Sequence, residues 1–372
     1  MTPKLRTIHL LALATVLALL LAACGEDAAA PGEEPDTEAT GAEEADAEAG
    51  DAGTEEADAE TGDADTEEAD AEAGDASTEE ADADGGGAVA ESVDLSGVDV
   101  TVGSKEFTEQ RIVGQIAVAA LEAAGASVTD QTGLSGTEVV RGALTGGEVD
   151  MYWEYTGTGW ITILQNDEPL EGADAYYEEV RSADEENGIV WLEPSEVNNT
   201  YAFFTNPAAV DLDVTSISDL EAAAQESPDQ VTLCAATEFI TRPDGLPGVE
   251  ETYGFEFSEV VEADLSLAVQ SAIDGEQCTV GEIFQTDPQI AANELNVLED
   301  DLEFFPAYNL AMTIREETYS ENAEAYDTLF GAITELLNNE TMTDLNGQVE
   351  LEGSSPDDVA RDFLVDNGII SE

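Results

Sequence analysis

The side chains best suited to chemistry in this sequence are aromatic rings, cations and hydroxyl groups, which recur in short motifs. Each motif offers at least one of these three kinds of group. The motifs are Gly103–Glu109, Tyr152–Thr158, Asn198–Tyr201, Glu238–Gly245, Phe284–Asp287 and Phe304–Asn309. None of them pairs a nucleophile with a base, so the pattern favours ligand binding over covalent catalysis.

Rings and cations suit the two ends of one kind of ligand. A quaternary ammonium cannot donate a hydrogen bond, so proteins hold it against π faces at ~0.5–2 kcal/mol per ring. Lys, Arg and Thr suit a carboxylate, where charged hydrogen bonds contribute ~1.5–3 kcal/mol each. A trimethylammonium group and a carboxylate together describe a betaine. The alternative is that these residues are ordinary core aromatics and surface cations.

Composition excludes many kinds of catalytic site. The 372 residues include one histidine, His9, in a segment that we expect to be cleaved. The mature chain then has no Ser-His-Asp triad, Cys-His pair or histidine metal ligand, and three cysteines without a CxxC exclude a zinc ribbon. We expect no metal and no cofactor. An enzyme acting on a quaternary amine would depend on carboxylates such as Glu106, Glu154 and Asp287.

The charge of the chain is extreme, with 86 acidic and 9 basic residues and a formal net charge of -77. Nucleic acid and anionic membrane surfaces are therefore excluded as partners, because both require basic patches. We interpret the acidity as adaptation to a salty habitat, where screening reduces self-repulsion. A solubility bias without meaning for habitat is the alternative.

The N-terminal region has the features of an export signal followed by a tether. Lys4 and Arg6 precede an apolar run that ends Leu21-Ala22-Ala23-Cys24, which resembles a bacterial lipoprotein signal over 1–23 with Cys24 as the lipidation site. An ordinary secretory signal is the alternative. Residues 24–94 repeat Thr-Glu-Glu-Ala-Asp-Ala from Thr54, Thr66 and Thr78. We expect a disordered spacer, and weak divalent-cation binding is the alternative.

Strand and helix patterns alternate after residue 95, which predicts an α/β protein with mostly parallel sheets. We expect strands at 98–102, 127–129, 149–155, 189–192, 201–205, 231–235, 279–284 and 311–314. Ser135 with Glu138 predicts a capping box, and Ser218 with Glu221 is expected to begin another helix. Further helices are expected at 108–124, 174–186 and 265–274, and three more end the chain, the last from Ser355. Ligands in such sheets lie outside the carboxyl ends of the strands, where the motifs fall.

Cys234 and Cys278 lie on segments predicted to be neighbouring strands. A disulfide is permitted outside the cytoplasm, and two buried free thiols are the alternative.

The motifs Gly-Ser-Lys-Glu-Phe-Thr-Glu, Tyr-Trp-Glu-Tyr-Thr-Gly-Thr, Asn-Asn-Thr-Tyr and Phe-x-x-Arg-x-Asp-Gly resemble those of glycine betaine/choline-binding proteins of ABC osmoprotectant importers. The resemblance implies a type II-like periplasmic-binding-protein fold whose chain crosses twice between two lobes. Lobe one is expected at 96–200 plus 306–372, and lobe two at 201–305.

The resemblance also implies the site. The family's cage of four tyrosines corresponds to Tyr155, Tyr201, Phe284 and Tyr308, where Phe284 departs from the usual tyrosine. The carboxylate clamp corresponds to the three residues Lys105, Thr158 and Arg242. Choline-restricted relatives tend to carry Asp at the place of Thr158, and two cations should repel choline. The resemblance therefore implies glycine betaine first, with proline betaine or carnitine next.

The resemblance further implies a monomeric receptor, not an enzyme, that serves an ABC permease with a separate ATPase. The sequence itself contains no P-loop. Such a receptor is extracytoplasmic, and Cys24 would anchor it to the outer face of the cytoplasmic membrane. A choline- or carnitine-preferring binding protein and an acidic surface lipoprotein without a transport role remain the alternatives.

Overall fold

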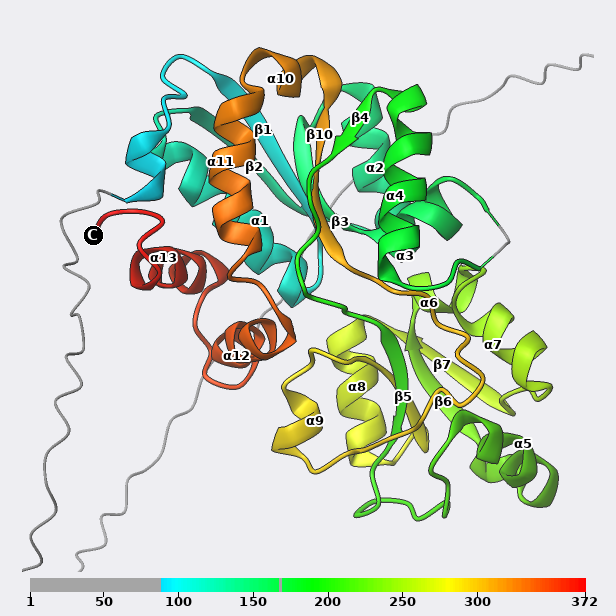
Figure 1. The fold of residues 1–372 in the computed structure, drawn as a ribbon. Coiled ribbons are helices and arrows are strands. Elements are labelled where there is room, and N and C mark those ends of the chain that lie inside the picture. The colour runs from blue at the N-terminus through cyan, green and yellow to red at the C-terminus, as the bar shows by residue number, and fades with distance from the viewer. Residues whose placement is uncertain (1–87, 167–168) are drawn as a thin grey trace, which may run out of the picture. The chain divides into compact units, whose positions relative to one another are not determined.

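The computed structural model describes residues 88–166 and 169–372 (Figure 1). The expected signal peptide 1–23, the lipidation site Cys24 and most of the expected tether lie outside these residues. The described chain forms two lobes, each built on a five-stranded sheet flanked by helices.

The sheet of lobe one takes strands from both ends of the described chain. Its spatial order is β2 (Ser127–Leu134), β1 (Asp99–Lys105), β3 (Met151–Tyr155), β10 (Leu310–Arg315) and β4 (Ile189–Trp191). Strand β10 runs antiparallel to both of its neighbours, whereas β1 is parallel to β2 and β3. The α-helices are α1 (Thr108–Ala123), α2 (Thr137–Gly146), α3 (Thr156–Thr158), α4 (Ala173–Asp184), α10 (Glu316–Glu321), α11 (Ala323–Thr334), α12 (Asn339–Glu350) and α13 (Pro356–Asp366).

The sheet of lobe two comes from one continuous segment. Its order is β7 (Glu259–Ala263), β6 (Thr232–Ala236), β8 (Val280–Phe284), β5 (Tyr201–Thr205) and β9 (Asn296–Val297). Strand β5 runs antiparallel to β8 and β9, and β6 is parallel to β7 and β8. The α-helices are α5 (Ile217–Glu226), α6 (Thr237–Thr241), α7 (Leu246–Tyr253), α8 (Leu265–Asp274) and α9 (Gln289–Ala292).

The chain crosses between the lobes twice, and the two crossing segments lie side by side (Figure 1). Asn198 and Asn309 form an antiparallel bridge. The Asn199 N–H donates to the Tyr308 carbonyl at 3.1 Å, and the Tyr308 N–H donates to Asn198 Oδ1 at 2.7 Å. Each crossing delivers the one strand that runs against its neighbours. The expected two-lobed α/β fold with mostly parallel sheets is therefore confirmed, with one antiparallel strand in each sheet.

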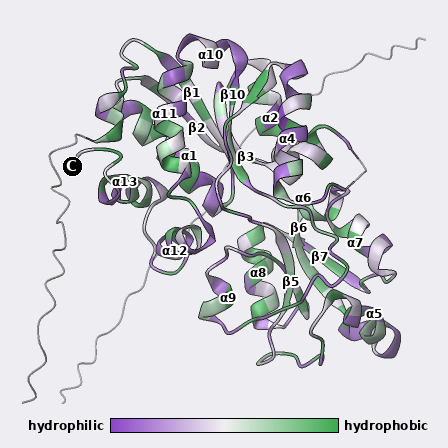
Figure 2. Cartoon of the chain, in the orientation of Figure 1, coloured by the Kyte–Doolittle hydropathy of each residue, from purple (hydrophilic) through white to green (hydrophobic). Residues whose placement is uncertain are grey.

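Helix α1 shows how the hydrophobic pattern produces the packing. Ile112, Val113 and Ile116 are fully buried on one face, and a fully buried aliphatic side chain contributes ~1.5–3 kcal/mol. Figure 2 shows the same division elsewhere, with hydrophobic strands inside and helices that carry one polar face.

Packing begins earlier than the expected end of the tether at residue 94. Residues Val89–Ser92 form a 3₁₀ turn, and the N–H groups of Val89 and Ala90 donate to the carbonyls of Gly368 and Ile369. Ala90 is buried. The expectation was wrong here because short apolar side chains follow the triple glycine and dock on the C-terminal segment.

Two expected helix starts are also corrected. Helix α2 has Gly136 as its N-cap, with φ 79°, and no side-chain cap. Helix α5 begins with a capping box from Ser216 and Asp219, two residues before the expected Ser218. With Ser216 as the N-cap, Ile217 becomes the first residue of the helix and is completely buried, which favours this start over Ser218.

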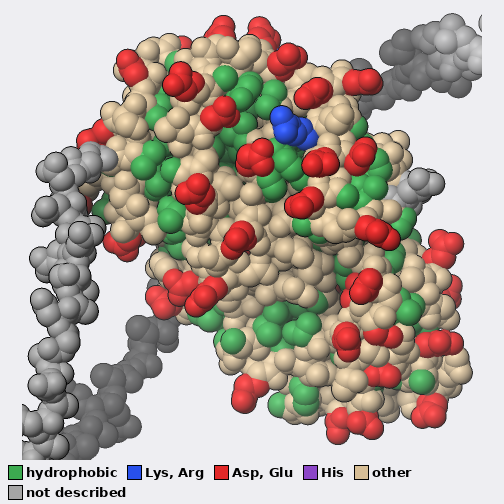
Figure 3. All heavy atoms as spheres, in the orientation of Figure 1, with side chains coloured by type: hydrophobic (Ala, Val, Ile, Leu, Met, Phe, Trp, Pro, Cys, Tyr) green, Lys and Arg blue, Asp and Glu red, His purple; other side chains and the backbone are tan. Residues whose placement is uncertain are grey.

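Acidic side chains are scattered over the face shown in Figure 3, with little positive charge among them. Within the described ranges, no helix is both long and apolar enough to cross a bilayer.

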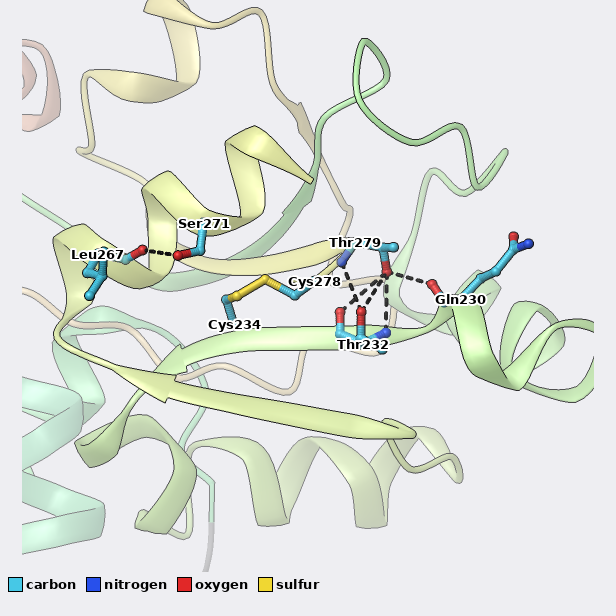
Figure 4. The surroundings of a disulfide bond; sticks show 7 residues. All are labelled: Gln230, Thr232, Cys234, Leu267, Ser271, Cys278 and Thr279. Atoms are coloured by element: carbon cyan, nitrogen blue, oxygen red, sulfur yellow. Dashed lines mark hydrogen bonds between the residues drawn. A yellow bond between two sulfur atoms is a disulfide. The ribbon is translucent and has the colours of Figure 1, made fainter. Parts of the chain in front are cut away.

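Cys234 on β6 and Cys278 just before β8 are joined by a disulfide (Figure 4). The bond links residues 44 positions apart. The loop that it closes carries α6, α7, β7 and α8, so the bond links β6 covalently to the residues just before β8.

Candidate functional site

A cavity of about 560 Å3 lies between the lobes, within the ~300–1,000 Å3 typical of small-molecule sites. All seven predicted ligand-binding residues line it, namely Lys105, Tyr155, Thr158, Tyr201, Arg242, Phe284 and Tyr308. They come from the ends of β1, β3 and β8, from α3, from the start of β5, from the segment after α6 and from the second crossing. The carboxyl ends of β1, β3 and β8 therefore meet the starts of the antiparallel strands β5 and β10 at this cavity.

Aromatic rings form a continuous wall in the cavity. Tyr201 lies at its centre, with ring centroids 4.9 Å from Phe284 and 5.5 Å from Tyr308. Phe107 lies 5.2 Å from Phe284 and 6.4 Å from Tyr155. Burial is the main cause that raises the pKa of Tyr201 and Tyr308 well above the usual phenol value. The rings therefore stay neutral, and the Arg242 guanidinium lies 5.5 Å from the centroid of the Tyr201 ring, a distance at which a cation is attracted to a π face.

Phe107 and Phe239 were missed as members of this wall, although both belong to the motifs that the sequence singled out. Phe239 lies 5.0 Å from Tyr201 and lines the cavity with Phe107. The signal that could have found them is their position, two residues after Lys105 and three before Arg242.

The close approach of the second crossing explains the glycine in Thr-Gly-Thr. A Cβ at Gly157 would lie 2.8 Å from the Ala307 carbonyl oxygen. Glycine therefore lets the segment after β3 pack against the crossing that carries Tyr308.

Lys105 is buried and paired. Its Nζ lies 2.7 Å from Glu154 Oε1 and 5.2 Å from the centroid of the Tyr155 ring. Glu154 is fully buried and also accepts from Tyr152 Oη at 3.0 Å. The ammonium group thus reaches the cavity with its charge already compensated.

Arg242 is more heavily engaged. Its Nε donates to Asp244 Oδ1 at 2.8 Å, and its Nη2 makes a second, short bond to Asp244. Nη1 donates to Glu238 Oε1 at 3.0 Å, and Nη2 also donates to Thr158 Oγ1 at 3.1 Å. Burial favours the neutral form of Asp244, but the Arg242 charge outweighs it and lowers the pKa of that carboxyl.

These pairs correct one premise of the sequence argument. The two cations Lys105 and Arg242 were expected to repel choline, but both are paired with carboxylates, of which Glu238 also lines the cavity. Glu238 stays ionised because the charges of Lys105 and Arg242 lower its pKa against the effect of burial. The cavity is lined by three cations, Lys105, Arg111 and Arg242, and by four carboxyl groups, those of Glu106, Glu238, Asp264 and Glu282, so its wall is not predominantly positive.

Glu109 joins the lobes and the crossing beside the cavity. Its carboxylate accepts from Tyr155 Oη at 2.7 Å, Asn199 Nδ2 at 2.8 Å and Thr286 Oγ1 at 2.6 Å, and from Asn346 Nδ2 at 3.2 Å. Burial raises its pKa. One carboxylate therefore links a ring of the cavity wall to lobe two.

Glu282 on β8 is another cavity residue that sequence reasoning missed. It is 1% exposed, and its Oε2 accepts from the Ala236 N–H at 2.7 Å. Burial, opposed by that hydrogen bond, raises its pKa to about 8. Glu282 was not predicted because it lies inside an expected strand and outside the motifs that offer rings, cations and hydroxyl groups.

The three carboxylates considered for an enzyme do not meet at one point. Glu106 lines the cavity, Glu154 is bound to Lys105, and Asp287 borders a separate cavity of about 20 Å3. In the part of the chain that the structure describes, no cluster of three or more His, Cys, Asp or Glu residues could hold a metal ion.

Known proteins resemble this chain over its folded part. The OpuAC family, described as the substrate binding domain of an ABC-type glycine betaine transport system, matches residues 98–366. A "Glycine-betaine-binding protein" of Pseudomonas aeruginosa is 39% identical over 279 residues, which cover 73% of this chain and 88% of that protein. The "Glycine betaine-binding protein YehZ" of Escherichia coli is 32% identical over 72% of this chain and 90% of that protein.

A further curated relative and a solved structure are also similar to this chain. An "Ergothioneine transport permease/ergothioneine binding protein EgtU" of Helicobacter pylori is 33% identical, but the match covers 71% of this chain and 47% of that protein. Among solved structures, apo YehZ superposes with a TM-score of 0.54 at 31% identity, over 73% of this chain and 99% of that one. The match length, the identities and the two-lobed cavity agree, so this chain belongs to the OpuAC family of transporter substrate-binding proteins, which are not enzymes.

Proposed function

We propose that this protein captures glycine betaine, or a related quaternary ammonium carboxylate such as proline betaine or carnitine, in the cavity between its lobes. The wall of aromatic rings centred on Tyr201 is the observation that carries the proposal, because neutral π faces suit a group that cannot donate hydrogen bonds. The names of the glycine-betaine-binding relatives support the same ligand class.

The carboxylate end of the ligand is assigned to Lys105, Thr158 and Arg242. Thr158 Oγ1 lies 3.1 Å from Arg242 Nη2 at the cavity wall. A carboxylate placed here would accept from the Thr158 hydroxyl and approach both cations. Choline is the second candidate, because the pairing of both cations removes the positive wall that was expected to reject it.

The transport role follows from the family. The protein hands its ligand to an ABC permease driven by a separate ATPase, and it acts as a monomer outside the cytoplasm. Lipidation at Cys24 anchors it to the outer face of the cytoplasmic membrane. Metabolic labelling with a fatty acid, compared between the full chain and a Cys24→Ala variant, tests the anchor.

Thermal unfolding with a ligand panel tests the binding function. The panel is glycine betaine, choline, carnitine, ergothioneine and proline, at equal concentration in high salt. A ligand at ~100 times its Kd adds ~2.7 kcal/mol to the unfolding free energy and raises the midpoint by several degrees. Proline, which lacks a quaternary ammonium, should give a smaller shift. No shift with any quaternary ammonium in a folded sample would overturn the proposal.

Thr158→Val tests the carboxylate clamp without breaking an ion pair. It removes one hydroxyl and keeps the shape, so betaine affinity should fall by ~3- to 10-fold while choline affinity stays within ~2-fold. Equal losses for both ligands in titration calorimetry would sink the assignment of Thr158.

A further inference from the structure

Glu282 has a place in the cavity that the proposed function does not yet use. It lies two residues before Phe284 on β8, so strand alternation puts both side chains on the same face of the sheet. The carboxyl is almost fully buried and still lines the cavity. It therefore forms part of the lobe-two wall beside the aromatic rings.

The two oxygens of Glu282 differ in their surroundings. Oε2 accepts from the Ala236 N–H at 2.7 Å, whereas Oε1 accepts no hydrogen bond from any residue in the described ranges. Among the cations that line the cavity, Arg242 is bound to Glu238 and Asp244, and Lys105 is bound to Glu154. The third cation, Arg111, donates from Nε to the Glu106 carbonyl at 2.8 Å. Glu282 forms no ion pair with a residue in the described ranges, and a buried carboxylate without a cationic partner is costly. A cationic group of a ligand could supply the missing counter-charge.

We propose that Glu282 is the counter-ion of the ligand's quaternary ammonium group, which it contacts through Oε1, and that capture of the ligand ionises this carboxyl and releases its proton. This inference rests on the proposed function and adds a residue that selects for ligands with a quaternary ammonium group over ligands without one. The released proton leaves to the buffer, and the ionised Glu282 carboxylate then offsets the positive charge of the ligand's ammonium group.

The charged and titratable groups around Glu282 agree with this role. Burial is the main reason that its pKa stands at about 8, Glu238 on α6 raises the pKa further, and Arg242 opposes both. On β5, the Tyr201 phenol responds to the Glu282 charge. The other charged residues that line the cavity are Lys105, Glu106, Arg111 and Asp264.

The pH dependence follows from the sign of this change. A cation close to Oε1 favours the ionised form and lowers the pKa in the complex. Between the pKa of the complex and that of the free protein, binding releases protons, so Kd should fall by up to ~10-fold for each unit of rising pH. Above about pH 8 the dependence should flatten.

Titration calorimetry of choline and glycine betaine at pH 7, in two buffers of different ionisation enthalpy, counts the protons released. The wild-type protein should release ~0.5–1 proton per ligand. Glu282→Gln keeps the size and the acceptor for Ala236, and it should release almost none and bind choline at least ~10-fold more weakly. The matched control is Glu259→Gln, at an exposed glutamate of β7 in the same sheet, which should behave as wild type.

The outcomes separate this inference from the proposed function. Absence of binding by the wild-type protein to every quaternary ammonium ligand would refute the proposed function itself. Binding without proton release, or an unchanged proton count in Glu282→Gln, would overturn the role of Glu282 and leave the function standing. If Glu282→Gln does not fold, the two-buffer measurement on the wild-type protein decides alone.

Discussion

The buried pair of Lys105 and Glu154 allows the charge arrangement of the cavity to be tested. The two side chains are 3% and 0% exposed, and their charged atoms are 2.7 Å apart. Lys105→Met would leave the Glu154 carboxylate buried without a cation, which typically costs 3–5 kcal/mol. Glu154→Gln would leave the ammonium group uncompensated in the same place, at a similar cost.

The double variant Lys105→Met with Glu154→Gln should cost less than either single change, because no uncompensated charge remains. A coupling of ~2–4 kcal/mol is expected from this cycle. Urea denaturation of the ligand-free protein, followed by circular dichroism, gives the four unfolding free energies. Additive losses would refute the reasoning and show that Lys105 is a free cation available to a ligand.

Three further predictions concern the rings, the disulfide and the pH range. Tyr201→Ala should weaken quaternary ammonium binding by ~2- to 30-fold in calorimetry, whereas Tyr201→Phe keeps the π face and should keep most of the affinity. Replacing Cys234 and Cys278 with alanine should lower the unfolding free energy by ~2–4 kcal/mol in urea denaturation; equal stability with and without the bond would contradict this. Burial, followed by the Glu350 charge, raises the pKa of Asp287 to about 7. Its contribution to the unfolding free energy is complete below about pH 4 and is lost as the pH rises through about 7. In urea denaturation across this pH range, Asp287→Asn should therefore reduce the loss of unfolding free energy with rising pH. The same pH dependence in Asp287→Asn and the wild-type protein would contradict this prediction.

Local signals predicted several elements closely. The ranges of β5 and α8 match the expected residues, and Ser355 caps α13 as expected. Strand β7 (Glu259–Ala263) was missed because its residues are exposed or half-buried at a sheet edge and show no clean alternation. The helix start at Ser216 was missed because two serines precede acidic residues at the right spacing, and only the burial of Ile217 distinguishes them.

The candidate site shows where such reasoning stops. All seven residues assigned from the family resemblance line the cavity. Several follow strands, as the rule for parallel strands predicts, whereas Tyr201 begins β5 and Tyr308 precedes β10, the two strands that run against their neighbours. Pairing depends on side chains that are distant in sequence, such as Lys105 with Glu154 across 49 positions. The sequence counts cations, but only the fold shows which of them carry a free charge.

The position of β10 has a consequence for the order in which the lobes can form. Lobe two completes its sheet within one continuous segment, from β5 to β9. Lobe one needs β10 between β3 and β4, so its sheet stays open until residues beyond lobe two are available. During synthesis lobe two can therefore fold first, and its folding brings the two crossing segments together. Completing the sheet of lobe one is then a short-range step, in which β10 pairs with β3 and β4.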